Sequence, residues 1–581
     1  LFEFAWVVVP YDETKHGDAY QSALTALDGR KLLHDFAQQE ESGEKSTISG
    51  ERQILGTQEI WTEVAKRQQY HGLRLSKSER LDAVDVIKRL AQDIEQDNER
   101  VIPRDQRNSF PSADTVATRS FVAALLKRLH EASASGKPEE QQVAKVLVDA
   151  VKKWDDWLNE CSQRHNLERS LFYRSDTTSG SAELQKQLAG NSAREAVEQL
   201  LDRDGEALFV GSFSRKRLAF RLGKTEQEVS QDSKDAQQCL RAVMAAAGRL
   251  GVQAPSPYYA VIKLDGDKMG DTISKLSSGE AHKIFSAALS TFAHGLNTWV
   301  GDEEYLGRVR VVYAGGDDAL ILAPADRALK LAHELQRKYT KAAGDALRSA
   351  HKVEKLENEP TASVGIVIAH RLMPLNIVLD EARKAEEAAK HHYHRNALVA
   401  TVLWRGGRSV SVGAQWDMPP ASPIQIEALK DEQPGDPTSA VALADVFQRL
   451  FAKDILSDRF AYYLEGEASA LAGLSNEANA SYEIERAKSG ITSEIKRLLK
   501  RQSSDSKQGK ELPDTDIQSL ADAIATLAKA IDDEYHASED KKRRAPLSLA
   551  ERGPRRGLVE VCGWLRLASF LARGREAGED E

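Results

Sequence analysis

The sequence has very little cysteine: Cys161, Cys239 and Cys562 are the only three in 581 residues. No two of them are close enough to form a Cys-x-x-Cys metal motif, and an odd number does not suit a framework of disulfides. These isolated thiols therefore predict a reducing compartment, and the cytoplasm is the simplest one.

Long apolar runs and an excess of positive charge are missing as well. The apolar stretches are far shorter than the roughly 18–20 residues that a membrane-spanning helix needs, so we expect no membrane segment. Lys and Arg total 80 against 89 Asp and Glu, a net charge of −9, so contacts with RNA must be local or shared with basic partners. With 41% hydrophobic residues and only 17 prolines, the chain is globular, and its length predicts about three to five domains.

The residue pattern changes twice along the chain. Helix-forming residues dominate from about 57 to 249, where Ser112 is a candidate N-cap, and again beyond a proline-rich linker at 419–437. Strand signals occupy the region between, at 258–264, 308–314, 319–323, 363–369 and 397–404, with helical patterns separating most of them. The order β-α-β-β-α-β, followed by a further helix and strand, predicts a ferredoxin-like sheet domain.

The two ends of the chain carry further expectations. Residues 2–10 predict a buried strand, and the chain begins with Leu1 inside what we expect to be a domain. After the linker, helices are predicted at 443–472, 482–500 and 517–535. The stretch 541–557 has seven Lys and Arg against one acid, which indicates either a solvated loop or a local basic surface.

Two acidic motifs carry the chemistry of the strand-rich region. An apolar strand runs into Asp265-Gly266-Asp267, and alternation along a strand would present both acids on one side, although Asp-Gly-Asp is also ordinary turn sequence. A second motif, Gly315-Gly316-Asp317-Asp318, lies between two apolar strands and predicts a tight hairpin. In the predicted sheet the first strand neighbours this hairpin, so we expect four carboxylates to converge.

Clustered carboxylates repel one another unless a cation neutralises them. Hard divalent ions such as Mg²⁺ bind carboxylate oxygens and keep open positions for waters and substrate phosphates. Two such ions can activate an attacking hydroxyl and stabilise a leaving pyrophosphate. The pair of motifs therefore predicts Mg²⁺ or Mn²⁺ with a nucleoside triphosphate such as ATP.

These motifs resemble those of a known family. The Asp-Gly-Asp strand end, the Gly-Gly-Asp-Asp hairpin and the segment 363–375 are similar to the palm, or nucleotidyl-cyclase-like, domain in the large subunit of type III-B CRISPR effector complexes, the Cmr complex. Residues 4–10, 79–81 and 110–112 also look like that subunit. The resemblance implies a cyclic oligoadenylate synthetase that uses ATP when the complex, loaded with guide RNA, binds target RNA. It also implies other Cmr subunits, guide RNA and target RNA as partners.

The resemblance assigns roles to individual residues. Asp265, Asp317 and Asp318 would be catalytic and would hold metal together with the Gly266 carbonyl and, least securely, Asp267. Gly315, Gly316 and Lys268 would border the nucleotide, and Lys390 and Arg395 would contact phosphate. A solvated basic helix end remains an equal interpretation for Lys390 and Arg395.

The sequence departs from the family in two places. Relatives commonly carry a Cys-x-x-Cys-Gly zinc knuckle, but here Ser46 and Ser49 stand where the thiols would be. Because hydroxyls are poor zinc ligands, we expect a metal-free loop and no zinc. The family also often has an HD nuclease and a complete first palm, whereas this chain begins near the end of that palm, and its dipeptide His34-Asp35 lacks nuclease partners.

The fold class that we predict is α+β: a ferredoxin-like palm domain between two mainly α-helical domains, with the remnant of a first palm-like domain at the N-terminus. The predicted boundaries are 1–56 for the remnant, 57–250 for the first helical domain, 251–415 for the palm and 416–581 for the C-terminal helices. Two other functions stay open. The chain could be a scaffold without catalysis, or a diguanylate cyclase, although Ala319 stands where such enzymes have a bulky aromatic residue after the hairpin acids.

Overall fold

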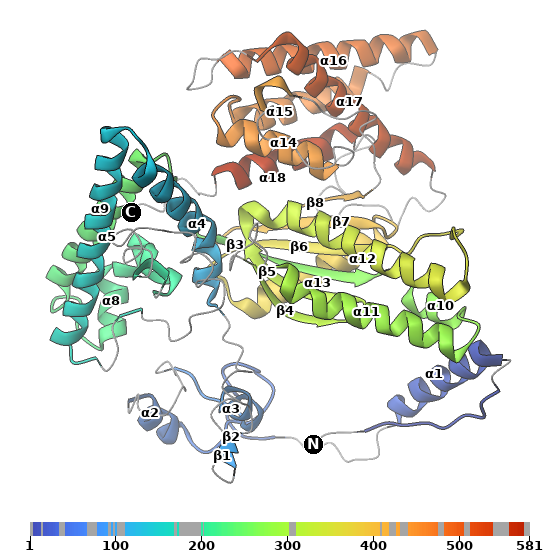
Figure 1. Cartoon of the computed structure of the whole chain (residues 1–581), viewed down its shortest axis with the longest axis horizontal. Helices are drawn as coiled ribbons and strands as arrows, with labels where there is room; N and C mark the ends of the chain where they lie inside the picture. Colours follow the sequence, from blue (N-terminus) through green and yellow to red (C-terminus); the bar gives the residue numbers. More distant parts are fainter. Residues whose placement is uncertain are drawn as a thin grey trace. The chain divides into compact units, whose positions relative to one another are not determined.

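The computed structural model places the chain in two compact units (Figure 1), residues Leu1–Pro10 with Ala19–Phe110 and Tyr11–Asp18 with Pro111–Glu581. The residues that the structure describes are 4–12, 15–33, 41–66, 78–90, 95–96, 99–100, 111–167, 171–172, 199–201, 203–300, 309–406, 409–416, 426–429, 440–474, 481–504, 512–537 and 557–573. Among them, no helix is both long enough and apolar enough to cross a membrane.

The first unit contains short elements around a small core. Its helices are α1 (His16–Leu32, whose first residues belong to the second unit), α2 (Gln58–Lys66) and α3 (Ala83–Leu90), and its strands are β1 (Glu95–Gln96) and β2 (Glu99–Arg100). The buried core residues are Ile54, Trp61 and Leu81. A core of this size explains why the unit consists mostly of loops and short helices.

The prediction of a strand at residues 2–10 is wrong for residues 4–10, the part of it that the structure describes. Residues 4–12 form no strand, and Phe4 and Val8 expose more than four fifths of their surface, at 84% and 82%. A strand is stable only when its backbone groups pair with a neighbour, and none of the described strands pairs with this segment. The apolar side chains consequently have no sheet face to cover.

The first predicted boundary also differs from the structure. Residues 57–110 were assigned to the helical domain, but the structure groups them with the first unit, up to Phe110. The reason is that Trp61 and Leu81, which follow the predicted boundary, share a core with Ile54, which precedes it. Helix-forming composition alone could not reveal this contact.

The helical domain follows in the second unit. Its helices are α4 (Ala113–Ala134), α5 (Pro138–Arg164), α8 (Arg215–Leu222) and α9 (Ser230–Arg249). The predicted N-cap is confirmed, because the backbone N–H of Thr115 donates to Ser112 Oγ at 3.0 Å. Trp154 and Leu158 on α5 share a core with Leu240 on α9.

The palm domain is a six-stranded sheet in the order β4-β5-β3-β6-β7-β8. The strands are β3 (Tyr258–Gly266), β4 (Arg310–Gly315), β5 (Asp318–Pro324), β6 (Ala362–His370), β7 (Ala397–Leu403) and β8 (Ser409–Gln415). β3 is antiparallel to both β5 and β6, and β6 is parallel to β7. The first four strands therefore have the predicted ferredoxin-like arrangement, which α13 and β7 extend and the unpredicted strand β8 completes.

Helices cover both faces of this sheet. On one face, α11 (Gly279–Trp299) and α12 (Ala328–His351) share a core with Tyr258, Ala260 and Ile262 of β3. On the other face, α13 (Leu375–His391) and α4 pack against Tyr259 and Val261. Because side chains alternate along β3, its odd-numbered residues face α13. This alternation decides the surroundings of Asp265.

The C-terminal helices join the palm core. They are α14 (Ala440–Ala452), α15 (Arg459–Leu474), α16 (Ser481–Ser504), α17 (Asp514–Ala537) and α18 (Gly557–Arg573). The helix predicted at 443–472 is two helices, because Asp454 between them has a left-handed backbone with φ 51°. The apolar helix α18, which the sequence did not single out, packs against α14 and β8. The basic stretch 541–556 lies outside the described residues, as do residues 34–35 and most of the predicted linker.

Candidate functional site

Two of the predicted acids face each other across neighbouring strands. Asp265 is paired with Asp318 in the register of β3 and β5. Both side chains lie on the face of the sheet that α13 covers, since Leu320 and Leu322 of β5 pack on that side. Cβ atoms of such a pair are about 4.5–5.5 Å apart, so two carboxylates meet at one end of the central strands.

Asp317 joins them from the hairpin. Gly316 turns the chain with φ 80°, a conformation that glycine adopts without strain, and the Gly266 N–H donates to the Asp317 carbonyl oxygen at 2.9 Å. Burial, followed by the negative charges of Asp265 and Asp318, raises the pKa of the Asp317 carboxyl. The three carboxylates thus bring negative charges close together at a partly buried position, where solvent screens their repulsion only in part.

Lys390 on α13 supplies the nearest positive charge. Its Nζ donates to Asp265 Oδ2 at 2.6 Å and also lies 2.6 Å from Glu386 Oε1. Burial disfavours the charged ammonium, but the hydrogen bonds to these two acids outweigh it and raise the pKa of Lys390. Lys390 is therefore held, fully charged, beside the acids.

Glu386 is a site residue that sequence reasoning missed. Its side chain is buried, and Oε2 accepts a hydrogen bond from Lys263 of β3 at 2.7 Å while Oε1 contacts Lys390. A signal was present: a lysine at position 263, inside an apolar strand, needs a buried acid as partner. Glu386 fixes both lysines and so orients Lys390 toward Asp265.

A glycine brings α13 close enough for this contact. A Cβ atom at Gly365 of β6 would lie 2.4 Å from the Glu386 backbone nitrogen and 2.6 Å from the Ala382 carbonyl oxygen. Only a residue without a side chain fits at this distance. The close packing of α13 on β6 therefore places Lys390 near enough to contact Asp265.

Asp267 does not join the other three acids. The sequence predicted convergence from strand alternation, but β3 ends at Gly266 and the chain turns there. The buried Asp267 carboxylate accepts hydrogen bonds from Thr361 Oγ1 at 2.8 Å, Ser363 Oγ at 2.7 Å and the Asn396 N–H at 2.9 Å. These donors occupy both of its oxygens and favour a positioning role over metal ligation.

The turn after α13 depends on Asp267. Three consecutive residues, His394, Arg395 and Asn396, have left-handed backbones with φ of 59°, 69° and 46°. Non-glycine residues adopt this conformation only when the surroundings hold them there. The hydrogen bond from the Asn396 N–H to Asp267 is one such constraint. It holds the backbone of the turn that contains Arg395.

The remaining predicted residues lie around the same end of the sheet. Gly315 pairs with Asp318 in the β4–β5 hairpin, and Gly266 ends β3. The exposed Lys268 follows Asp267 with a left-handed backbone, φ 53°. Arg395 is partly exposed, and its buried Nε atom has no hydrogen-bond partner among the described residues.

Two tyrosines were also missed. Tyr313 of β4 bonds through its hydroxyl to Asp318, whose negative charge raises the pKa of the phenol. Tyr339 of α12 is buried, and its hydroxyl donates to the Met269 sulfur at 3.0 Å. Burial, followed by the nearby charges of Asp317, Asp267 and Asp265, raises the pKa of Tyr339. The Tyr339 side chain therefore stays neutral beside the acidic cluster.

The loop with Ser46 and Ser49 is closed by hydrogen bonds. Ser46 Oγ donates to Asp85 Oδ2 at 2.9 Å, and Ser49 Oγ donates to Asp82 Oδ2 at 2.8 Å. Ser46 and Asp82 are almost fully buried, at 2% and 1% exposed. The two hydroxyls of the Ser-x-x-Ser segment thus donate directly to an Asp-x-x-Asp pair, and the metal-free loop stays a prediction.

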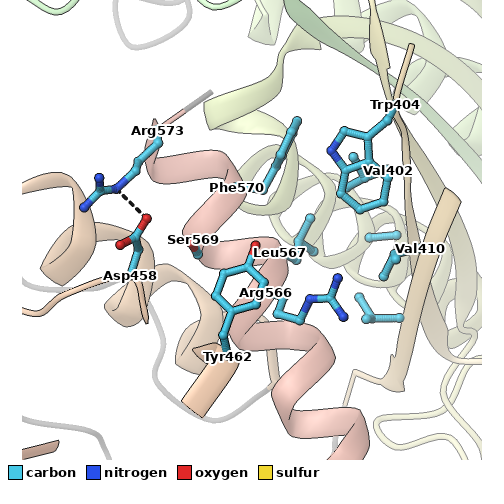
Figure 2. A pocket seen from close by; sticks show the side chains of 12 residues that line it. Val402, Trp404, Val410, Asp458, Tyr462, Arg566, Leu567, Ser569, Phe570 and Arg573 are labelled. Carbon is cyan, nitrogen blue, oxygen red and sulfur yellow. Dashed lines mark ion pairs between the residues drawn. The ribbon is translucent and has the colours of Figure 1, made fainter. Parts of the chain in front are cut away.

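A cavity of about 220 Å³ lies away from the acids, between β7, β8 and α18 (Figure 2). Trp404, Tyr462 and Phe570 line it, together with Arg566 and Arg573. Both arginines already pair with acids, Arg573 with Asp458 at 2.9 Å and Arg566 with Glu465 at 3.0 Å. The cavity contains none of the predicted site residues, and these pairs leave little charge for a ligand.

The fold and the acids together define a palm-like domain with three carboxylates gathered at one end of its central strands. Asp265, Asp317 and Asp318 offer carboxylate oxygens at one point, and their mutual repulsion is the feature that a hard divalent cation removes. The donor set therefore fits Mg²⁺ or Mn²⁺ by its chemistry.

Comparison with known proteins agrees with this definition. Residues 258–399 match the Cas10/Cmr2 second palm domain family. The Cmr subunit Cmr2 of Pyrococcus furiosus is 24% identical over 326 residues, which are 51% of this chain and 33% of that protein. The chain thus spans about a third of the length of this curated relative.

Solved structures of a Cmr-beta complex and of a Csm1–Csm4 cassette are also similar. The apo type III-B Cmr-beta structure matches with a TM-score of 0.47 and 13% identity, over 89% of this chain and 61% of that one. A Csm1–Csm4 cassette in complex with cA3 matches with a TM-score of 0.24 and 15% identity, over 46% of this chain and 36% of that one. The resemblance inferred from the acidic motifs is confirmed by the family match and by the Pyrococcus relative: the chain is similar to Cas10/Cmr2 proteins, most directly over their second palm domain.

Proposed function

We propose that the palm domain converts ATP to cyclic oligoadenylate by nucleotidyl transfer with two divalent metal ions, within an RNA-guided type III-B effector complex. The observation that carries this proposal is the placement of Asp265 directly opposite Asp318, with Asp317 beside them. A chain that served only as a scaffold would gain nothing from three repelling carboxylates at one point.

Asp265, Asp317 and Asp318 would hold one or two Mg²⁺ or Mn²⁺ ions. When bound, such ions lower the pKa of an attacking 3′-hydroxyl and neutralise the leaving pyrophosphate. The Gly266 carbonyl is a further candidate ligand at the end of β3. Asp267, with both oxygens engaged by hydrogen-bond donors, would keep the turn after α13 in place instead of binding metal.

The basic residues around the acids would bind the triphosphate. Lys390, which now neutralises Asp265, would exchange that carboxylate for a phosphate oxygen once a metal ion takes over the acid. Arg395 and Lys268 would supply further contacts from the two adjoining turns, and Gly315 and Gly316 would let the nucleotide approach the hairpin backbone.

The other partners belong to the same proposal. Guide RNA, target RNA and the other Cmr subunits would contact the helical domains and local basic surface, in the cytoplasm. Two ATP molecules must be juxtaposed before the hydroxyl of one can reach the α-phosphate of the other. We therefore expect the chain alone to be weak or inactive, and full turnover by the isolated chain would contradict this requirement.

Two other functions remain as competing outcomes. A non-catalytic scaffold would organise guide and target RNA without turning over ATP. A diguanylate cyclase would use GTP, although the small Ala319 after Asp318 does not supply the bulky aromatic residue expected in such enzymes.

One assay separates the three. The reconstituted complex is incubated with ATP or with GTP, with and without target RNA, and the products are identified by mass spectrometry. Oligoadenylate that forms from ATP only when target RNA is present supports the proposal. Products from GTP alone favour the cyclase alternative, and no product with either nucleotide favours the scaffold.

A further inference from the structure

Three metal-binding side chains meet in the helical domain, far in sequence from the palm acids. Cys161 lies in the last turn of α5, His165 caps that helix one turn later, and Asp232 lies in the first turn of α9. One ligand atom from each residue lies within 4.8 Å of the other two, and His165 Nε2 is 2.8 Å from Asp232 Oδ2. Cys161 is buried, while the other two side chains are each 14% exposed.

The three donors have the chemistry of a transition-metal site. Thiolate, imidazole and carboxylate are the ligands of zinc, whereas Mg²⁺ prefers oxygen alone. In a tetrahedral zinc site, ligand atoms are about 3.3–3.6 Å apart, given Zn–S near 2.3 Å and Zn–N and Zn–O near 2.0 Å. Small side-chain movements would reach this spacing. We propose that Cys161, His165 and Asp232 form a zinc site with one position left open for water.

Arg164 competes with the metal for these ligands. Its guanidinium lies 2.6 Å from Asp232 Oδ1 and also hydrogen-bonds to Cys161. Half of the Arg164 side chain is exposed, so it can turn into solvent without opening the core. When zinc binds, the Cys161 thiol gives its proton to solvent, a sulfur–zinc bond forms, and the Arg164 contacts break.

The buried thiol must lose its proton before it can bind a metal ion. Burial, with a smaller effect of the Asp232 charge, raises the pKa of Cys161 to about 11, so the free thiol is protonated at neutral pH. The charged groups that face it are Asp232 of α9 and Arg164 of α5. Because the thiolate is the form that ligates zinc, we expect metal affinity at this site to rise with pH.

The site would join the end of α5 to the start of α9. These two helices share the core that contains Trp154, Leu158 and Leu240. A metal ion bound at their ends would therefore cross-link two helices that already pack together. The expectation of no zinc rested on isolated cysteines and on Ser46 and Ser49. The new cluster is compatible with a metal-free serine loop because it lies elsewhere and uses a single thiol.

The test uses cobalt as a probe on the full chain after treatment with a chelator. Co²⁺ bound to a thiolate gives a near-ultraviolet charge-transfer band, which ions held by the palm carboxylates do not give. We expect about one equivalent to produce this band and added zinc to remove it. Cys161→Ser should abolish the band, and Cys239→Ser, which alters a half-buried cysteine outside the cluster, should leave it unchanged.

Arg164→Ala distinguishes a metal site from a hydrogen-bonded contact between the helices. If the cluster binds zinc, removal of the competing guanidinium should tighten cobalt binding several-fold. His165→Ala should weaken binding at least tenfold while circular dichroism remains that of the parent, and Asp232→Asn offers a second variant if that protein does not fold. No thiolate band in the parent and in Arg164→Ala, or a band that survives Cys161→Ser, would overturn the proposal.

Discussion

The Lys390 ammonium lies 2.6 Å from Asp265 Oδ2, so a lysine of α13 neutralises an acid of the central strand. The same lysine also forms an ion pair with the buried Glu386. This arrangement makes Lys390 a counter-ion in one state and, by our proposal, a phosphate ligand in the other.

The first prediction concerns this lysine. Lys390→Ala should reduce oligoadenylate synthesis roughly 10- to 150-fold, the equivalent of a charge-assisted hydrogen bond of about 1.5–3 kcal/mol to phosphate. Lys384→Ala is the matched control, because Lys384 is on the same helix but 63% exposed and paired only with Glu381. Initial rates with saturating and limiting ATP test this, and equal rates for both variants would remove Lys390 from the site.

The second prediction separates chemistry from assembly. Asp317→Ala with Asp318→Ala should lower synthesis by about 10³-fold or more, which is roughly 4 kcal/mol of lost transition-state stabilisation. Target-RNA affinity of the reconstituted complex, measured at one stated salt concentration, should be unchanged. Asp380→Ala, an exposed acid of α13, serves as control. Equal loss of RNA binding and synthesis would mean that the acids are structural.

The third prediction follows from the raised pKa of Asp317. A carboxyl whose pKa is raised by folding stabilises the protein while protonated, and this contribution is lost as pH rises through the folded-state pKa. Asp317→Asn should therefore raise the melting temperature of the metal-free protein at pH 7 by roughly 1–3 °C, with the gain vanishing near pH 4. Thermal melts in a chelator across this range test the sign. A gain that grows as pH falls would be inconsistent with it.

The fourth prediction concerns metal and nucleotide together. Mg²⁺ or Mn²⁺ should strengthen ATP binding, because triphosphate oxygens fill the coordination positions that Asp265, Asp317 and Asp318 leave open. Titration calorimetry of the chain with ATP, with the ion and with a chelator, measures the difference. Equal affinity in both conditions would show that these acids do not bind a metal–nucleotide complex.

The fifth prediction addresses the serine loop. Ser46→Ala should lower the stability of the first unit by about 1 kcal/mol, because it leaves an oxygen of the partly buried Asp85 carboxylate without the donor Ser46 Oγ. Zinc content should not change in this variant, whereas any zinc that copurifies should disappear with Cys161→Ser. Elemental analysis of both variants after dialysis checks this, and zinc that depends on Ser46 would refute the metal-free interpretation.

Much of the palm could be predicted because its signals are local. Apolar runs that end in Asp-Gly-Asp and flank Gly-Gly-Asp-Asp specify strands and a hairpin, and the ferredoxin-like order then brings Asp265 and Asp318 together. The orientation of Asp267 depended on the residue at which β3 ends, which alternation cannot reveal. Glu386 and the cluster around Cys161 depend on packing between elements far apart in sequence. The exposed segment at residues 4–12 likewise shows that an apolar pattern makes a strand only when a partner strand exists.

The order of strands in the sheet has a consequence for biosynthesis. β3 leaves the ribosome first, yet its two neighbours, β5 and β6, follow only after long intervening helices, and Lys390 comes later still. Contacts between distant segments form slowly, because a long loop must close before they contribute. Asp265 can therefore reach its contacts with Asp318 and Lys390 only after almost the whole palm has been translated. By our proposal the acids bind nucleotide only as a group, so they cannot do so while the chain is growing, and the site is completed only when the palm has folded around it.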